Sequence, residues 1–206
     1  MDQTAPAVAG VSADVDSPSA SPASTVTVTF DEPVVIPGAA ALSLTLDGAP
    51  LATDGLTVAV DPADDHSVLI EGLAALQTGD GDYALSLDLT GLTDRAGNAG
   101  AGTAEATWTI DTAAPAAPAD LAVTPDAGAS SADGVTNTTA VTLTGTLGET
   151  GLTVSIHDET SGEDLGTADV TGTDFTADLS LDAGGLHELR ITATDAAGNA
   201  ADSFFD

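Results

Sequence analysis

The stretch Thr25-Val26-Thr27-Val28-Thr29-Phe30 decides the fold class of this chain, because polar and apolar residues alternate in it without exception. Side chains of a β-strand point alternately to its two faces, so Val26, Val28 and Phe30 share one face and the three threonines share the other. This pattern predicts a half-buried strand whose apolar face packs on a core.

Similar runs follow along the chain and are separated by short turns rich in Gly and Asp, such as Asp47-Gly48. No stretch carries the sustained apolar stripe of a helix, and short strands at regular spacing predict an all-β sandwich or barrel. The further predicted strands are Leu42–Leu46, Leu56–Val60, Val68–Ile70, Tyr83–Leu89, Thr103–Ile110, Leu121–Thr124, Ala140–Thr146, Leu152–His157, Thr167–Thr171, Phe175–Leu181 and Leu186–Thr194.

The apolar positions of these alternating strands predict the two hydrophobic cores, because the side chains of one strand face must leave water together. The predicted core residues are Val26, Val28, Phe30, Leu44, Leu85, Leu87 and Trp108 in the first half, and Val141, Leu143, Val154, Ile156, Leu189 and Ile191 in the second.

A five-residue phrase, Asp-x-Ala-Gly-Asn, occurs twice, at Asp94–Asn98 and at Asp195–Asn199. The copies are about 100 residues apart, the length of one β-sandwich domain, and each follows a long predicted strand. Between them lies the proline-containing connector 111–118, which is short enough to restrict bending. The sequence therefore predicts two tandem sandwich domains, residues 1–111 and 112–206.

The charge balance excludes several classes of function. The 206 residues include 33 Asp and Glu against 2 Lys and Arg, for a net charge of −31, and no Cys. Both basic residues are arginines, so no lysine is available for a phosphate-binding loop, a Schiff base or an isopeptide cross-link. So acidic a surface repels nucleic acid and anionic membranes, and without Cys the plentiful metal ligands are oxygen atoms.

The acidity has a second interpretation, adaptation to a saline habitat, because at about 1 M salt the screening length falls to ~3 Å and self-repulsion becomes tolerable. This interpretation and cation binding are compatible. No apolar run approaches the roughly 20 residues of a membrane span, and the N-terminus does not open a signal peptide. We therefore expect no membrane insertion and, if the parent protein is secreted, an internal segment of it.

Several phrases resemble the bacterial immunoglobulin-like (Ig-like) repeats of large surface adhesins, most closely from Trp108 to Asn199. The resemblance implies an all-β fold of two tandem Ig-like β-sandwich domains that act as a spacer in an extracellular fibre. It also implies neighbouring Ig-like repeats of the same chain as partners, often with Ca²⁺ at domain junctions. The phrases are the two Asp-x-Ala-Gly-Asn copies, the connector from Thr109 to Pro115, and Thr124-Pro125-Asp126 to Asp133-Gly134-Val135-Thr136-Asn137; Val28–Pro33 resembles a sister family.

The Asp-x-Ala-Gly-Asn loop is a candidate cation ligand, because its carboxylate and its Asn carbonyl can converge on one hard ion. One loop supplies too few of the six to eight oxygens that Ca²⁺ takes, so the connector and the neighbouring domain would have to complete the site. The other interpretation is a pair of Asx turns with Gly in the left-handed region, and both stay open. The candidate ligands are Asp94, Asn98, Asp111, Asp133 and Asn137 for one junctional ion, with Asp126, Asp195 and Asn199 as further candidates.

No residue pattern predicts catalysis. His157 precedes Asp158 and Glu159, but adjacent residues of a strand point to opposite faces. His187 is expected to contact backbone, His66 lies in an acidic turn, and nothing marks a carboxylate pair in an apolar pocket. We therefore expect a protein that is not an enzyme.

The alternative from another class is a glycan-binding accessory module of a secreted polysaccharide-active protein. Sugar platforms use exposed aromatic rings, whereas this chain has one Trp, one Tyr and four Phe. Trp108 and Phe30 fall in strands that are predicted to bury them, which favours the spacer.

Overall fold

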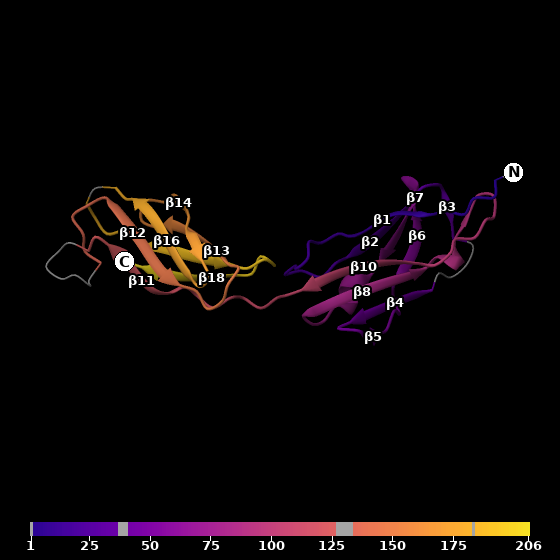
Figure 1. Ribbon diagram of the computed structural model, residues 1–206, viewed down its shortest axis with the longest axis horizontal. Helices are drawn as coiled ribbons and strands as arrows, with labels where there is room; N and C mark the ends of the chain where they lie inside the picture. Colours follow the sequence, from indigo (N-terminus) through magenta and orange to yellow (C-terminus); the bar gives the residue numbers. More distant parts are fainter. Residues whose placement is uncertain (1, 37–40, 127–133, 183) are drawn as a thin grey trace. The chain divides into compact units, whose positions relative to one another are not determined.

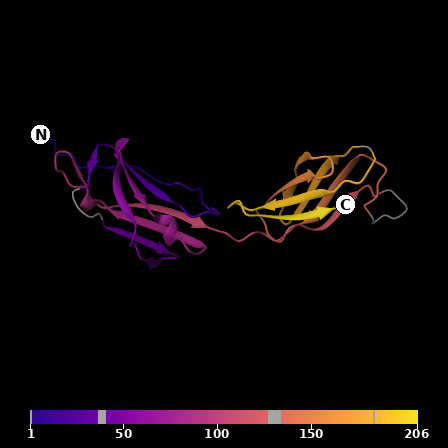
Figure 2. The ribbon, with the colours of Figure 1, turned by 180° about the vertical axis from the view of Figure 1, so that it is seen from behind.

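The computed structural model describes residues 2–36, 41–126, 134–182 and 184–206, and the chain divides into two compact units (Figure 1). Unit 1 is Met1–Thr112 and unit 2 is Ala113–Asp206. Each unit has its own pair of four-stranded sheets, which Figure 2 shows from behind. The helices of the described residues are two short 3-10 turns, η1 (Leu73–Leu76) and η2 (Leu89–Gly91) in unit 1, so no described helix has the length to cross a membrane.

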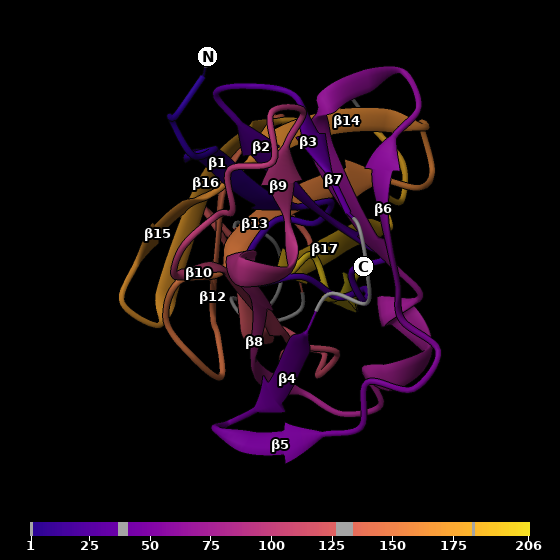
Figure 3. The same ribbon diagram turned by 90° about the vertical axis from the view of Figure 1, so that its right-hand side faces the viewer.

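Unit 1 is built from two four-stranded antiparallel sheets and one two-stranded ribbon. Figure 3 looks along this unit and shows β8, β4 and β5 side by side at one edge. The first sheet has the order β1 (Val8–Ala13), β2 (Thr25–Phe30), β7 (Asp64–Glu71) and β6 (Thr57–Asp61); the second has β10 (Thr103–Ile110), β8 (Gly81–Asp88), β4 (Leu42–Leu46) and β5 (Ala49–Leu51); the ribbon pairs β3 (Val34–Val35) with β9 (Thr93–Asp94).

Unit 2 repeats the order of the two main sheets strand for strand. Its first and second strands pair with each other, and its last strand lies at the edge of the opposite sheet, as in unit 1. One sheet has the order β11 (Ala119–Thr124), β12 (Ala140–Thr146), β16 (Asp174–Ser180) and β15 (Asp169–Thr171); the other has β14 (Glu163–Thr167), β13 (Thr153–Asp158), β17 (Leu189–Thr194) and β18 (Ala200–Phe205). The fold is therefore all-β, with two tandem Ig-like sandwiches, as the sequence predicts.

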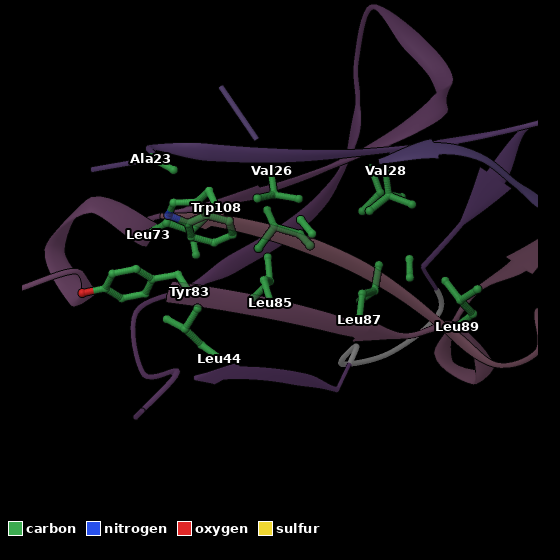
Figure 4. Close-up of a cluster of buried hydrophobic side chains, with 14 of the residues drawn as sticks. Ala23, Val26, Val28, Leu44, Leu73, Tyr83, Leu85, Leu87, Leu89 and Trp108 are labelled. Atoms are coloured by element: carbon green, nitrogen blue, oxygen red, sulfur yellow. The ribbon is translucent and has the colours of Figure 1, made fainter. Parts of the chain in front are cut away.

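The alternating strands place their apolar residues between the two sheets of each unit. In unit 1, Val26 and Val28 of β2 face Leu85 and Leu87 of β8 (Figure 4), and all four side chains are buried. In unit 2 the corresponding core is formed by β12, β13, β16 and β17. All thirteen of the predicted core residues are buried, so the period-two pattern was sufficient to find them.

A buried polar contact closes one end of the unit 1 core. The side chain of Gln77 accepts hydrogen bonds from the indole N–H of Trp108 (2.7 Å) and from the backbone N–H of Ala23 (3.1 Å), and donates to the Ala23 carbonyl (2.8 Å). Trp108 stacks on Tyr83 with ring centroids 5.9 Å apart (Figure 4). The Tyr83 hydroxyl donates to the carbonyl of Gly79 (2.7 Å), the arrangement of a tyrosine corner in Ig-like sandwiches.

The strands that the sequence did not predict are mainly edge strands, β1 and β18 among them. β1 contains Gly10, and β18 ends in the adjacent residues Phe204 and Phe205, so neither shows a clean alternation. An edge strand buries less of itself and so needs no strict pattern. The predicted strand from Leu186 begins instead at Leu189, because the residues before it contact the end of β13.

Replacement of Gln77 by Leu is expected to destabilise unit 1 by more than about 2 kcal/mol, because it leaves the Trp108 indole and both Ala23 backbone groups buried without their partner. The free energy of unfolding is measured in urea by fluorescence of Trp108, the single Trp of the chain, which reports on unit 1 alone. The matched control is Gln3→Leu at an exposed position. Equal unfolding midpoints for the two variants would contradict the prediction.

Candidate functional site

The two copies of Asp-x-Ala-Gly-Asn occupy equivalent places in the two sandwiches. Asp94 ends β9, just before the last strand of unit 1, and Asp195 follows β17, just before the last strand of unit 2. Gly97 and Gly198 both have φ of 93°, in the left-handed region, where a side chain is strained. The phrase is therefore a repeated turn with a fixed backbone path.

In unit 1 the loop is closed by its own carboxylate. Asp94 is 4% exposed, and its oxygens accept hydrogen bonds from the backbone N–H (2.7 Å) and the side-chain amide (2.6 Å) of Asn98. Burial alone raises the pKa of Asp94, but the hydrogen bonds from Asn98 and from the loop backbone outweigh it and lower the pKa below the usual 3.8. The Asn98 amide group therefore points at Asp94 as a donor.

In unit 2 the second copy has the same contacts. Asp195 accepts hydrogen bonds from the backbone N–H groups of Ala197 and Asn199 (both 2.9 Å) and from the Asn199 side-chain amide (2.9 Å). The hydrogen bond from the Asn199 side chain lowers the pKa of Asp195 against the opposing effect of burial. Both loops are therefore Asx-type turns, one of the two interpretations that the sequence left open, and the carboxylate supports the turn whether or not a cation binds.

The structure separates residues that were predicted to share one ion. Asp111 directly follows β10, whereas the Asp94 loop lies beside the start of that strand, where Gly100 donates to the Leu92 carbonyl. Eight residues of extended strand span about 25 Å. Asp94 and Asn98 therefore lie at one end of unit 1 and Asp111 at the other, so the prediction that they bind one ion together is wrong.

The remaining candidates lie in unit 2 and are also divided between its two ends. Asp126 accepts a hydrogen bond from the backbone N–H of Gly134 (3.2 Å), close to Asn137 and to the C-terminal end of β18. Asp195 and Asn199 lie at the opposite end of β18, where Thr194 pairs with Ala200. Asp133 is outside the described residues.

Two further carboxylates lie beside Asp94. Oxygens of Asp2, Glu32 and Asp94 are all within 4.8 Å of one another. Burial raises the pKa of Glu32, and the negative charges of Asp94, Asp2 and Asp31 raise it further. No sequence signal points to Asp2 and Glu32, because they are distant in sequence from Asp94 and belong to no motif. Three crowded carboxylates supply oxygen ligands of the kind that Ca²⁺ prefers, so the residues present fit that ion.

A second group with potential metal ligands lies on the β6–β7 hairpin. Asp64, Asp65 and His66 bring ligand atoms within 4.8 Å of one another, and Asp65 also forms an ion pair with Arg95. The Asp64 carboxylate accepts hydrogen bonds from the Ser67 hydroxyl and the His66 backbone, and these hydrogen bonds lower its pKa. This group already has a counter-charge and is partly exposed to solvent, so it is a solvated turn.

The largest aromatic side chains are in the core. Trp108 is 2% exposed and Tyr83 is 1% exposed, and Phe30 and Phe175 are also buried. Phe204 on edge strand β18 is the exposed aromatic residue, at 56%. A stacking platform for sugars needs several exposed rings, so the aromatic residues do not favour glycan binding.

His187, which was expected to contact backbone, also has a charged partner that was not predicted. His187 Nδ1 lies 2.6 Å from Asp158 Oδ2, and Asp158 is 2% exposed. His157, in contrast, lies on the outer face of β13 while Asp158 points inward, as the strand alternation requires. No sequence signal connects Asp158 with His187, because the contact depends on how β13 and β17 pair.

Replacement of Asp195 by Asn is expected to destabilise unit 2 at neutral pH. The two carboxylate oxygens accept hydrogen bonds from three N–H groups, and in either orientation of the Asn side chain its own NH₂ group would point at one or more of these donors. Since the folded state lowers the pKa of Asp195, its contribution is present above about pH 4 and is lost as the pH falls through the folded-state value. The difference between variant and wild type should therefore shrink in acid.

This difference is measured in urea at several pH values from the amide NMR signals of β17. Asp169→Asn, at an exposed position on β15, is the control. A loss of unfolding free energy in Asp195→Asn that is equal at pH 7 and pH 3 would refute the assigned role of the carboxylate.

Comparison with solved structures finds matches at low sequence identity. The fibronectin(III)-like modules of Clostridium thermocellum CbhA match with 14% identity over 95% of this chain and 91% of theirs, at a TM-score of 0.49. An I-band fragment of titin matches with 10% identity over 98% of this chain and 65% of its own length, less than two thirds, at a TM-score of 0.44. The N-terminal part of the bacterial S-layer protein SbsC matches with 18% identity, 98% and 44% coverage, and a TM-score of 0.37.

Curated proteins give no sequence match. The family model of the bacterial Ig-like domain matches residues 113–205, which is nearly the whole of unit 2. This match agrees with the two sheets of unit 2, with its buried aliphatic core and with its Asp-x-Ala-Gly-Asn turn. Residues 113–205 of this chain are a bacterial Ig-like domain.

Proposed function

We propose that this chain is a structural extender, a pair of spacer modules in an extracellular or cell-surface protein. The observation that carries the proposal is the repetition of one self-contained module. Each unit closes its own core between two sheets of the same strand order, and among the described residues neither core takes side chains from the other unit. A module that needs nothing from its neighbour can be repeated to set a distance, and its partners are then the adjacent Ig-like repeats of the same chain.

The polar groups of the two units support this role. The buried or motif carboxylates Asp94, Asp158 and Asp195 are all engaged in hydrogen bonds that hold turns. A net charge of −31 keeps such a module hydrated in a salt-containing medium outside the cell. These features support a structural, non-enzymatic module better than an enzyme.

We further propose that Ca²⁺ stabilises unit 1 at Asp2, Glu32 and Asp94. These carboxylates come from the N-terminal segment, the connection after β2 and the end of β9, so an ion among them would join three separate segments. The mutual repulsion that raises the pKa of Glu32 would be relieved by a bound cation. The expectation from the sequence that Ca²⁺ also stiffens the connector stays a prediction.

A spacer must carry tension, so force spectroscopy of the whole chain tests the proposed function. Because the chain has no Cys, one cysteine added at each end gives unique attachment points. We expect two separate unfolding events with contour increments of roughly 400 Å for unit 1 and roughly 340 Å for unit 2, less the folded lengths, at about 3.6 Å per residue. One event of the combined length would contradict the independence of the modules.

Ca²⁺ is expected to raise the melting temperature of unit 1, and to raise it less when Glu32 is replaced. At 1 mM Ca²⁺ a site with a dissociation constant of ~10⁻⁴ M adds about 1.4 kcal/mol, or roughly 5–8 °C in melting temperature. Without Ca²⁺, Glu32→Gln removes a repelled charge and should raise the melting temperature of unit 1. With Ca²⁺, the same variant should gain less from the ion than the wild type.

Trp108 fluorescence reports the melting temperature of unit 1 in the wild type and in Glu32→Gln. Mg²⁺ and NaCl at equal ionic strength separate a specific site from screening, because Mg²⁺ demands a near-octahedral shell. Glu105→Gln on β10 removes one exposed charge elsewhere in the same unit and serves as the matched control. Equal gains in all three salts, or equal gains for Glu32→Gln and the wild type, would reject the site.

A further inference from the structure

His187 connects the two sheets of unit 2. Its Nδ1 lies 2.6 Å from the carboxylate of Asp158, the last residue of β13, and its Nε2 lies 3.2 Å from the backbone carbonyl of Asp182, two residues beyond β16. β13 and β16 belong to opposite sheets. The imidazole ring is therefore a bridge across the sandwich, and 15% of its side chain is exposed.

Asp158 accepts the hydrogen bond from His187 Nδ1 as an ionised carboxylate. Its other oxygen accepts hydrogen bonds from the backbone N–H groups of Thr160 (2.9 Å) and Ser161 (3.2 Å), which only an acceptor can satisfy. Burial raises the pKa of Asp158, but the hydrogen bonds from His187, Ser161 and Thr160 outweigh it and lower the pKa. Asp158 is therefore ionised at neutral pH.

Both ring nitrogens of His187 face acceptors. A carboxylate oxygen and a backbone carbonyl oxygen each need an N–H, and a neutral imidazole has only one. The doubly protonated ring satisfies both contacts. When the ring loses a proton, the tautomer that keeps the bond to Asp158 presents a lone pair to the Asp182 carbonyl, and that contact becomes repulsive.

The charges around the ring favour its protonation. The hydrogen bond with Asp158 raises the pKa of His187 above the usual 6.5, burial opposes this, and the Asp182 carbonyl and the charges of Asp158 and Asp182 raise it further. Glu188 is adjacent in sequence, and Glu159 beyond Asp158 forms an ion pair with Arg190, the one basic residue of unit 2. Asp206 lines the same cavity of about 550 Å³ as His187.

Unit 1 holds the equivalent position with a tyrosine. Tyr83 stands two residues before the buried Leu85 of β8, as His187 stands two residues before the buried Leu189 of β17. The hydroxyl of Tyr83 donates to the Gly79 carbonyl (2.7 Å). The two units therefore anchor a backbone carbonyl with different side chains, a phenol in unit 1 and an imidazole in unit 2.

We propose that His187 is a proton-dependent latch, which in its doubly protonated form ties the residues after β16 to the end of β13 and releases the Asp182 carbonyl when it is deprotonated. The contribution of His187 to stability is complete below about pH 6.5 and is lost as the pH rises through its folded-state value. The contribution of Asp158 is present above about pH 4 and is lost in acid. The latch is therefore closed between these limits and opens as the pH rises through the folded-state pKa of His187.

The test follows the three His side chains of the whole chain by long-range ¹H–¹⁵N NMR from pH 4.5 to 9.5. His66→Gln, His157→Gln and His187→Gln assign the signals. We expect both nitrogens of His187 to be protonated at pH 6.5, with a midpoint above that value. A midpoint at or below 6.5, or a ring that is already a single tautomer at pH 6.5, would overturn the proposal.

Hydrogen exchange of the amides of Leu181, which precedes Asp182 and donates to the Thr139 carbonyl (2.8 Å), and of Glu188, measured on the same chain and corrected for intrinsic rates, reports the opening itself. Linkage requires the opening equilibrium to rise up to tenfold for each unit by which the folded-state pKa of His187 exceeds that of the open state. His187→Tyr, which copies unit 1, should remove the pH dependence between pH 5 and 9, and His187→Gln provides a second variant if Tyr does not fit.

His157→Gln on the outer face of β13 is the matched control and should keep the wild-type pH dependence. Protection of these amides that does not change across the titration, or that changes equally in the wild type and in His187→Gln, would show that the ring is only a packing element.

Discussion

The structure depends on how a chain with 33 acidic residues and 2 basic ones stabilises its carboxylates. Side-chain cations are almost unavailable, so backbone N–H groups take their place. Asp61 accepts from the N–H of Ala63, Asp88 from Thr90, Asp94 from Asn98 and Asp195 from Ala197 and Asn199. Each of these bonds closes a turn between strands, so the acidic residues that repel one another at long range fix the local chain path.

The two units meet this constraint in the same fold but with different buried polar groups. In unit 1 the side chains that hold the corner beside Trp108 are neutral, with Gln77 between Ala23 and Trp108 and with the Tyr83 hydroxyl on Gly79. In unit 2 an ion pair between Asp158 and His187 holds the equivalent corner. Identical strand order therefore does not imply identical response to pH, because the anchors differ in chemistry while the sheets do not.

The sequence was most informative where burial follows a simple period. Val26, Val28, Ile156 and Ile191 were assigned to the cores from alternation alone, since a slip of one residue would turn a whole strand face toward water. Alternation says little about edge strands such as β18, which satisfies its hydrogen bonds on one side only and tolerates an irregular pattern.

The candidate site was predicted less well, because its contacts join residues that no local pattern connects. The Asp-x-Ala-Gly-Asn turns were visible as motifs, but the approach of Asp2 and Glu32 to Asp94 depends on three connections at one end of a sandwich. The same reason explains the error for Asp111, whose distance from Asp94 is set by the length of β10. Long-range placement of side chains needs the register of the sheets, which composition and spacing do not contain.

The near absence of basic residues also limits where proteases can cleave the chain. Proteases of the trypsin type require Lys or Arg in their specificity pocket. This chain offers them only Arg95 and Arg190, which form ion pairs with Asp65 and Glu159. Arg190 also lies inside β17, hydrogen-bonded between β13 and β18, so a protease would have to unfold unit 2 to reach that bond. Arg95, by contrast, is 70% exposed in the turn after β9, so a chain of this composition presents one accessible cleavage site for this class of proteases while unit 2 stays folded.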